Sequence, residues 1–276
     1  MKKDKDQNPI IKIPFEKLLK HFSSENVIEN IEKEYQTSSP KNISTSLIDD
    51  NVFIRKAKVN ENKLIKDFSH LPQLGIKSPV IIRAKKDHYE IILGRRRLLA
   101  AKKFNIPVIP CVLIDVGDEE TLLLMAADLR DSVTRNMIEF SIVCNLLKDK
   151  FGYTQKDLAS LMHQSRAQIT NIMRLSTLPD SVLNDVSTGK LSFGHAKALI
   201  TLPDQIINEL VSRIYREKLS VRDTEKIIYE YKHGIDYSRD EERLSEKYNC
   251  KTNILRKRIV LTFESEEEQK AFIKKI

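Results

Sequence analysis

Three patterns of hydrophobic and polar positions follow one another along the chain. Residues 1–42 are polar and rich in Lys, Asn and Ser, which predicts a flexible basic arm with no more than a weak amphipathic turn near Phe15–Phe22. In residues 43–131, short β-branched apolar runs alternate with stretches of helical spacing, which predicts a small α+β domain. Its expected strands are Val80–Arg83, Tyr89–Leu93 and Val108–Asp115, and its expected helices are Lys63–His70 and Arg95–Phe104.

The pattern after residue 131 is mainly helical. Residues 132–232 predict an all-α domain, and residues 237–276 predict a small α/β module with one strand at Arg258–Phe263. Because one strand and two helices are too small to fold alone, we expect this module to pair with a second copy of the chain. Ser265 and Glu268 have the spacing of a capping box at the start of the last helix. The expected helices are Glu120–Arg130, Asn136–Phe151, Pro179–Val186, His195–Ile200, Pro203–Glu217, Ser220–Tyr231, Asp240–Tyr248 and Ser265–Lys275.

A helix-turn-helix is predicted at Gln155–Arg174, where small Ala159 stands at the helix crossing and apolar residues follow at core spacing. His163 occupies the turn position that needs a positive φ, which histidine tolerates better than most residues other than glycine. Arginine and glutamine make bidentate contacts to guanine and adenine edges, so the second helix could read DNA. The alternative is a helical hairpin that only packs a core. The residues expected to contact DNA here are Gln155, Ser165, Arg166, Gln168, Thr170 and Asn171.

A second candidate site is the segment GRRRLLAAKKF at Gly94–Phe104. A strand runs into the glycine and a helix begins with three arginines, so backbone N–H groups, the positive helix end and guanidinium groups converge there. This arrangement suits phosphates, either of a nucleotide or of a DNA backbone. The alternative is an ordinary basic helix start that faces solvent.

Composition narrows the class of function. Lys and Arg number 47 against 39 Asp and Glu, and the net charge of +8 suits a polyanionic partner. No apolar run approaches the length of a membrane span, and the N-terminus lacks the apolar core of a secretory signal. Cys111, Cys144 and Cys250 are far apart, which argues against a zinc site and a disulfide framework and favours a reducing cytoplasm.

Together these motifs resemble the ParB family of chromosome and plasmid partition proteins over residues 43–276. The segments VFIRKAKVNENKL and LGIKSPVIIR place Arg55, Gly75, Ser78 and Pro79 at family positions, and GRRRLLAA resembles the family's G-E-R-R-x-R-A-A phosphate motif. GKLSFGHAKAL resembles the segment after the family's helix-turn-helix, and RIVLTFESEEEQKAF resembles its dimerisation module. The implied fold is a ParB/sulfiredoxin-like α+β domain, an all-α helix-turn-helix domain and a small α/β dimerisation module.

The resemblance implies a function as well. The first domain would bind CTP with Mg²⁺, and the nucleotide would close a homodimer as a clamp around a palindromic site in double-stranded DNA. The clamp would slide from that site, associate with the nucleoid in the cytoplasm, and stimulate a ParA-type ATPase through the arm. The implied nucleotide-binding residues are Lys77, Ser78, Pro79, Gly94, Arg95, Arg96, Arg97 and Asp128, of which Asp128 is also the candidate metal ligand. The implied further DNA contacts, mostly to phosphates, are Lys190, Ser192, His195 and Lys197.

Two positions depart from the family pattern. Arg95 stands where the family has glutamate, and DLRDS at Asp128–Ser132 stands where it has E-N-x-x-R. A guanidinium in place of a carboxylate removes a Mg²⁺ ligand and adds a cation, so we expect Arg95 to replace part of the metal charge and any CTPase activity to be weak.

Two other functions compete with the clamp. One is a transcriptional regulator of the same family that binds operators without spreading. The other is an enzyme, either sulfiredoxin-like, although cysteine is missing from the GRRR turn, or a nuclease. The carboxylates that a nuclease could use are Asp115, Asp118, Glu119 and Glu120.

Overall fold

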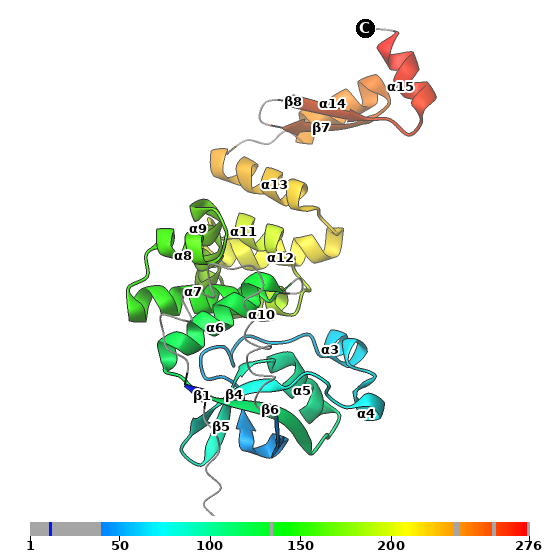
Figure 1. Cartoon of the computed structure of the whole chain (residues 1–276). Helices are drawn as coiled ribbons and strands as arrows, with labels where there is room; N and C mark the ends of the chain where they lie inside the picture. The colour runs from blue at the N-terminus through cyan, green and yellow to red at the C-terminus, as the bar shows by residue number, and fades with distance from the viewer. Residues whose placement is uncertain (1–10, 13–39, 133–134, 235–237, 256–257, 275–276) are drawn as a thin grey trace, which may run out of the picture. The chain divides into compact units, whose positions relative to one another are not determined.

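The computed structural model describes residues 11–12, 40–132, 135–234, 238–255 and 258–274, so most of the predicted arm, including Phe15–Phe22, lies outside the described residues. The chain divides into two compact units, residues 1–200 and 201–276, and each is described by itself (Figure 1). Among the described residues, no helix is both long and apolar enough to span a membrane. The three-domain boundaries expected from the sequence remain a prediction.

The first unit contains a mixed β-sheet. Its strands follow the order β1-β6-β4-β5-β3, and β2 pairs with β6 off this path. The predicted strands β4 and β5 form an antiparallel hairpin, and β4 runs parallel to β6. Two segments that the sequence places in the arm differ from that prediction, because Ile11–Lys12 and Lys41–Asn42 pair with β6. The strands are β1 Ile11–Lys12, β2 Lys41–Ser44, β3 Ile48–Asp49, β4 Val80–Lys85, β5 His88–Leu93 and β6 Val108–Asp115.

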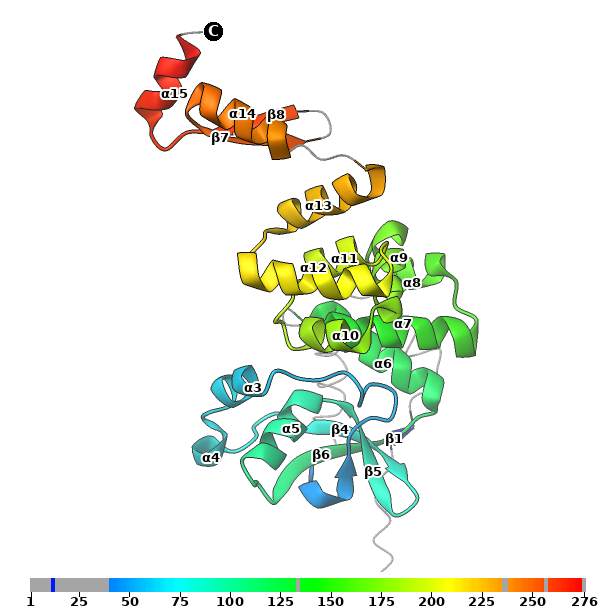
Figure 2. The same cartoon turned by 180° about the vertical axis from the view of Figure 1, so that it is seen from behind.

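Alternate residues of the central strands face opposite sides of the sheet, as the period of a strand requires. Ile82 and Ile91 pack with Leu98 of helix α5 on one face. Ile81 and Ile92 pack with helix α6 on the other face. Figures 1 and 2 show the helices on the two sides of the sheet. The helices of the first unit are α3 Glu61–Asp67, α4 Leu71–Leu74, α5 Arg95–Lys103, α6 Asp118–Asp131, α7 Met137–Phe151, α8 Gln155–Leu161, α9 Arg166–Arg174, α10 Asp180–Ser187 and α11 Phe193–Leu199.

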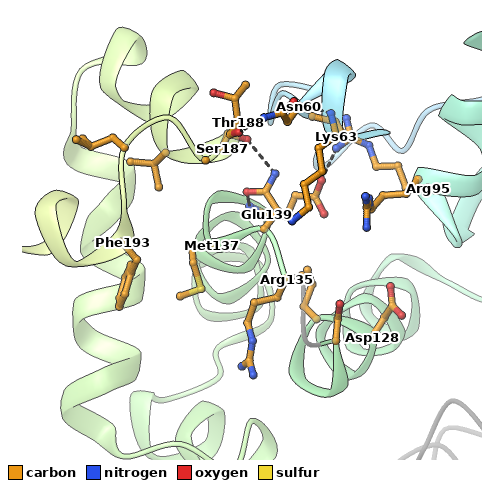
Figure 3. A pocket seen from close by; sticks show the side chains of 18 of the residues that line it. Asn60, Lys63, Arg95, Asp128, Arg135, Met137, Glu139, Ser187, Thr188 and Phe193 are labelled. Carbon is orange, nitrogen blue, oxygen red and sulfur yellow. Dashed lines mark hydrogen bonds and ion pairs between the residues drawn. The ribbon is translucent and has the colours of Figure 1, made fainter. Parts of the chain in front are cut away.

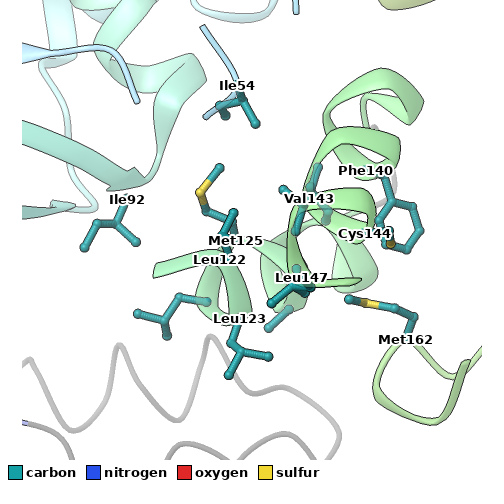
Figure 4. Close-up of a cluster of buried hydrophobic side chains, with 14 of the residues drawn as sticks. Ile54, Ile92, Leu122, Leu123, Met125, Phe140, Val143, Cys144, Leu147 and Met162 are labelled. Atoms are coloured by element: carbon teal, nitrogen blue, oxygen red, sulfur yellow. The ribbon is translucent and has the colours of Figure 1, made fainter. Parts of the chain in front are cut away.

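One hydrophobic core joins the sheet to the helix-turn-helix (Figure 4). Ile92 of the sheet, Leu122 of α6, Phe140 of α7 and Met162 at the end of α8 all belong to this core. Helix α6 is buried from Thr121 to Ala127, so its apolar residues meet the sheet on one side and α7 on the other. The α+β part and the DNA-reading helices are therefore one packed body as far as residue 200.

The second unit contains α12 Asp204–Glu217, α13 Val221–His233, α14 Ser238–Tyr248, β7 Lys251–Leu255, β8 Arg258–Thr262 and α15 Glu266–Ile273. Strand β7 is absent from the sequence-based prediction and pairs antiparallel with β8. Ser265 accepts a hydrogen bond from the backbone N–H of Glu268, as predicted. The Glu268 carboxylate, however, accepts from Glu264 rather than from Ser265, so only half of the predicted capping box forms.

Candidate nucleic-acid interface and adjoining pocket

Helices α8 and α9 form the predicted helix-turn-helix. Thr154 and Asp157 cap α8 reciprocally, and Ser165 caps α9 by accepting from the backbone N–H of Gln168 at 3.2 Å. His163 has φ of +50°, so the histidine in the turn adopts the left-handed conformation that the motif requires. The backbone N–H of Gln164 closes the turn by donating to the Ala159 carbonyl at 3.0 Å.

Helix α9 presents one apolar and one polar face. Ile169, Ile172 and Met173 are buried, whereas Arg166 and Gln168 are exposed. The two exposed side chains stand on a rigid helix, which is the arrangement that base reading in a major groove needs. Among the predicted contacts, Ser165 is also exposed and Asn171 is half-buried.

A hydrogen bond between Thr170 and Gln155 links the two helices. The Thr170 hydroxyl hydrogen-bonds with the side chain of Gln155 at 3.2 Å and with the Arg166 carbonyl at 2.9 Å. Arg174, which the sequence-based prediction missed, is exposed at the end of α9. It lies seven residues, two helical turns, after the exposed Ala167, and that spacing could have identified it.

The four predicted DNA contacts in and just before α11 fall into two pairs. Lys190 and Lys197 are exposed, and Lys190 lies 3.5 Å from the Asp185 carboxylate. The Ser192 hydroxyl caps α11 by accepting from the backbone N–H of His195 and lies 2.7 Å from the ring Nδ1 of His195. Ser192 and His195 therefore orient the helix start, while the two lysines point their charge outward.

A cavity of about 520 Å³ lies in the first unit beside the start of α5 (Figure 3). Residues from α3, α5, α6, the segment before α7 and the turn between α10 and α11 line it. In this view Asn60 and Lys63 stand on one side, with Asp128 and Arg135 on the other. The charged lining residues are Lys63, Arg95, Arg96, Arg97, Arg135, Asp128 and Glu139, so basic groups predominate.

The sharp start of α5 requires glycine. Gly94 has φ of +88°, and a Cβ at that position would lie 3.0 Å from Val80 Cγ1. Arg96 donates to Asp67 at 2.6 Å and its guanidinium carbon lies 5.6 Å from the centre of the Phe68 ring. The glycine therefore turns the chain from β5 directly into the run of arginines that lines the cavity.

Arg97 connects α5 to the LGIKSP segment. Its guanidinium donates to the carbonyls of Ser78 and Pro79, each at 2.8 Å. Neither of these residues nor Lys77 lines the cavity, and Lys77 is exposed. Gly94, the three arginines and Asp128 therefore line one cavity. The other three predicted nucleotide contacts lie outside its lining.

Arg95 is buried and is held by protein groups. It donates two hydrogen bonds to the Asp50 carboxylate, at 2.7 and 2.8 Å, and a third to Glu139 of α7. A further bond of 3.0 Å reaches the Ala57 carbonyl. Burial alone would lower the pKa of Arg95, but Asp50 and Glu139 raise it, so the guanidinium stays charged. Two carboxylates therefore already compensate the charge of Arg95, and the expectation that it replaces metal charge beside a nucleotide stays a prediction.

Glu139 shares this buried environment. Burial raises the pKa of the Glu139 carboxyl above its ordinary value, and Arg95 opposes that rise. Among the described residues, no group of three or more His, Cys, Asp or Glu side chains could hold a metal ion.

Lys63 and Arg135 line the same cavity and were missed by sequence reasoning. Lys63 lies in the first turn of α3, and Arg135 comes just before Asn136, the N-cap of α7. Lys63 belongs to the segment VFIRKAKVNENKL, but the resemblance did not single it out, and only the fold brings it to the same cavity as Arg135.

The cysteines are buried, and two of the four carboxylates that a nuclease could use are paired with other side chains. Burial raises the pKa of Cys111 and of Cys144 to about 12, so both thiols are protonated at neutral pH. Asp118 forms an ion pair with Arg83 at 2.8 Å, and Glu119 accepts from the Tyr153 hydroxyl at 2.9 Å. These contacts give the acidic residues a structural role.

The fold and site define a helix-turn-helix protein with a basic cavity beside the start of α5. A ParB N-terminal domain model matches residues 29–128, and a ParB helix-turn-helix domain model matches residues 134–233. The probable chromosome-partitioning protein ParB of Campylobacter jejuni is 34% identical over 198 residues, which cover 70% of this chain and 71% of that protein. The probable chromosome-partitioning protein ParB of Helicobacter pylori is 28% identical over 236 residues, which cover 79% of this chain and 81% of that protein. The chain belongs to the ParB family, which confirms the resemblance and the fold class that the sequence predicts.

Solved structures of Caulobacter crescentus ParB, truncated at the C-terminus, are also similar to this chain. The complex with the centromeric parS site is 27% identical with a TM-score of 0.41, over 69% of this chain and 99% of that one. The complex with CTP-γ-S is 23% identical with a TM-score of 0.31, and the match covers 63% of this chain and 99% of that one.

Proposed function

We propose that this chain binds a palindromic site in double-stranded DNA as a homodimer and closes there as a CTP-gated clamp that works with a ParA-type ATPase in DNA segregation. The observation that carries the proposal is the exposed pair Arg166 and Gln168 on α9, held by a correctly formed turn and cap. Their guanidinium and amide groups suit bidentate contacts to bases in a major groove. Lys190 and Lys197 add exposed positive charge for the DNA backbone.

The cavity beside α5 supports the nucleotide part of the proposal. Its excess of basic side chains and its uncapped helix start suit a phosphate chain. The cavity also contacts Gly189 and Ser192, which flank Lys190. A ligand in this cavity would therefore touch the segment that positions a DNA contact.

The second unit supports the dimer. Its sheet has only two strands, and Ile259 of β8 and Ile273 of α15 are 56% and 63% exposed. A two-stranded sheet is marginal alone, and large exposed apolar side chains favour burial against a partner. A second copy of β8 and α15 would cover both residues.

A non-spreading regulator of the same family is the second candidate. It is favoured by Arg95, whose charge two carboxylates already compensate. In that case CTP would not change how long the protein stays on DNA, and CTP hydrolysis would be absent rather than weak.

Selection from fragmented genomic DNA of the source cell tests the proposal. The purified full-length chain should enrich fragments that share one palindromic motif. The variant Arg166→Ala should lose or broaden that motif, whereas Arg222→Ala, an exposed arginine on α13, should preserve it. Enrichment without a palindrome, or the same motif with Arg166→Ala, would contradict the proposal.

A further inference from the structure

The cavity beside α5 is poorly suited to magnesium. Mg²⁺ takes oxygen ligands in a near-octahedral shell, and proteins usually supply one or two carboxylates beside the phosphate oxygens. Asp128 and Glu139 are the only carboxylates that line the cavity within the described part of the chain. Glu139 is 13% exposed and already accepts from Arg95. Within the described lining, a dication would therefore find Asp128 as its one other carboxylate, among five basic side chains.

Two of the five basic side chains that line the cavity have no hydrogen-bond or ion-pair partner among the described residues. Arg95 is held by carboxylates, Arg96 by Asp67, and Arg97 by two carbonyls. The side chains of Lys63 and Arg135, in contrast, form no hydrogen bond or ion pair with any residue that the structure describes. Their charge is available to a ligand.

Hydrogen bonds to Ser187 and Thr188, at the end of α10, hold the segments that carry Lys63 and Arg135. The Asn60 side chain caps α3 at Lys63 and donates to the Thr188 carbonyl at 2.7 Å. The Asn136 side chain, adjacent to Arg135, donates to the Ser187 hydroxyl at 2.9 Å. Residues 187–188 thus anchor both the α3 start and the α7 start, which carry Lys63 and Arg135.

We propose that this cavity binds the triphosphate of a nucleotide without a divalent cation, and that Lys63 and Arg135 neutralise the phosphate charge instead. The proposal rests on the proposed nucleotide site and specifies its chemistry. Charge-assisted hydrogen bonds from ammonium and guanidinium groups to phosphate are strong in a partly enclosed cavity. A phosphate chain that already carries Mg²⁺ offers less negative charge to these side chains, so the metal should not improve binding.

Isothermal titration of the full-length chain with CTP, and separately with inorganic tripolyphosphate, tests this inference. The dissociation constant in EDTA should equal the value in Mg²⁺ or be smaller. Lys63→Ala and Arg135→Ala should each weaken binding in EDTA about tenfold, the loss of roughly one charge-assisted hydrogen bond. Lys66→Ala, on an exposed position of the same helix, and Arg222→Ala should leave it unchanged.

The outcomes separate this inference from the proposed function. CTP binding that weakens tenfold or more in EDTA would overturn metal-free binding and leave the nucleotide site standing. Metal-free binding that survives both variants would overturn the assignment to Lys63 and Arg135. Failure of both probes to bind under either condition would overturn the inference together with the nucleotide site, while DNA selection would still test DNA binding on its own. Thermal melting and DNA affinity of each variant confirm that it is folded.

Discussion

At the scale of single residues, Arg95 is a buried cation of the first unit that forms ion pairs with two carboxylates. Its buried guanidinium joins Asp50, which precedes the loop to α3, to Glu139 in the first turn of α7. A buried ion pair contributes little net stability as a whole, but removal of one partner leaves an uncompensated charge. Arg95 therefore links the start of α5 to the start of α7 and to the segment before α3.

The variant Arg95→Met should lower the free energy of unfolding by about 3 kcal/mol at neutral pH, because Asp50 and Glu139 lose their shared cation. The double variant Arg95→Met with Glu139→Leu should lose less than the single variant. Urea unfolding followed by circular dichroism measures both. A single variant within about 0.5 kcal/mol of wild type would show that the buried contacts do not hold the helix.

The same variant should have a distinctive pH dependence. Burial raises the pKa of Glu139, and Arg95→Met removes the opposing effect of the guanidinium. The folded variant then holds its proton to a higher pH than the unfolded chain does. Its destabilisation should be largest at neutral pH and should shrink as the pH falls through the raised pKa of Glu139. A loss that grows as the pH falls would contradict this assignment.

Gln168 offers a direct test of base reading. Gln168→Ala should cost about 1–3 kcal/mol on the cognate site and relax specificity at one position, because a bidentate contact is lost. Fluorescence anisotropy on cognate and random duplexes measures both effects. Lys190→Ala is the control: it should weaken both duplexes alike and flatten the salt dependence by about one unit of slope. Equal losses on both duplexes for Gln168→Ala would refute its role as a reader.

At the scale of elements, helices with strong local signals could be predicted from the sequence. Helix α7 begins after Asn136 and ends at Gly152, which has φ of +75°, so a cap and a glycine mark both ends. Strand β7 could not be predicted, because KTNIL has little apolar alternation and becomes a strand by pairing with β8. β1 likewise depends on β6, a partner far away in the sequence.

The candidate site also contains features that the local sequence predicts and features that depend on distant segments. The turn, caps and exposed residues of α9 follow from local sequence, and the structure agrees with them. The partners of Arg95 and the position of Arg135 depend on segments 38 residues or more distant in the sequence that meet only in the folded protein. Local pattern carries no signal for such contacts, which explains why the carboxylate partners of Arg95 and the place of Arg135 beside the cavity were not predicted.

Asn136 tests how one cap supports the start of α7. Its side chain accepts from the backbone N–H of Ile138 and donates to the Ser187 hydroxyl. Asn136→Ala should therefore cost about 1–2 kcal/mol of stability. Asn136→Asp keeps the cap and loses the donor, so its cost should be intermediate. Equal unfolding midpoints for wild type and Asn136→Ala would exclude a capping contribution.

At the scale of the whole molecule, dimerisation depends on the C-terminal module. A chain that lacks residues 237–276 should be mostly monomeric in analytical ultracentrifugation without DNA, because the exposed apolar residues of β8 and α15 are removed. It should also bind the palindromic site more weakly, since two linked half-site contacts become independent. A truncated chain that stays dimeric would place the dimer contact elsewhere.

The most direct test of the nucleotide-gated clamp is a genome-wide occupancy profile in the source cell, with wild type beside Arg96→Ala and the control Lys66→Ala. The account predicts a few peaks with shoulders that extend on the order of kilobases in wild type and in the control, and narrow peaks in Arg96→Ala, whose side chain lines the cavity. Narrow peaks in all three would contradict the clamp and identify a site-specific DNA-binding regulator.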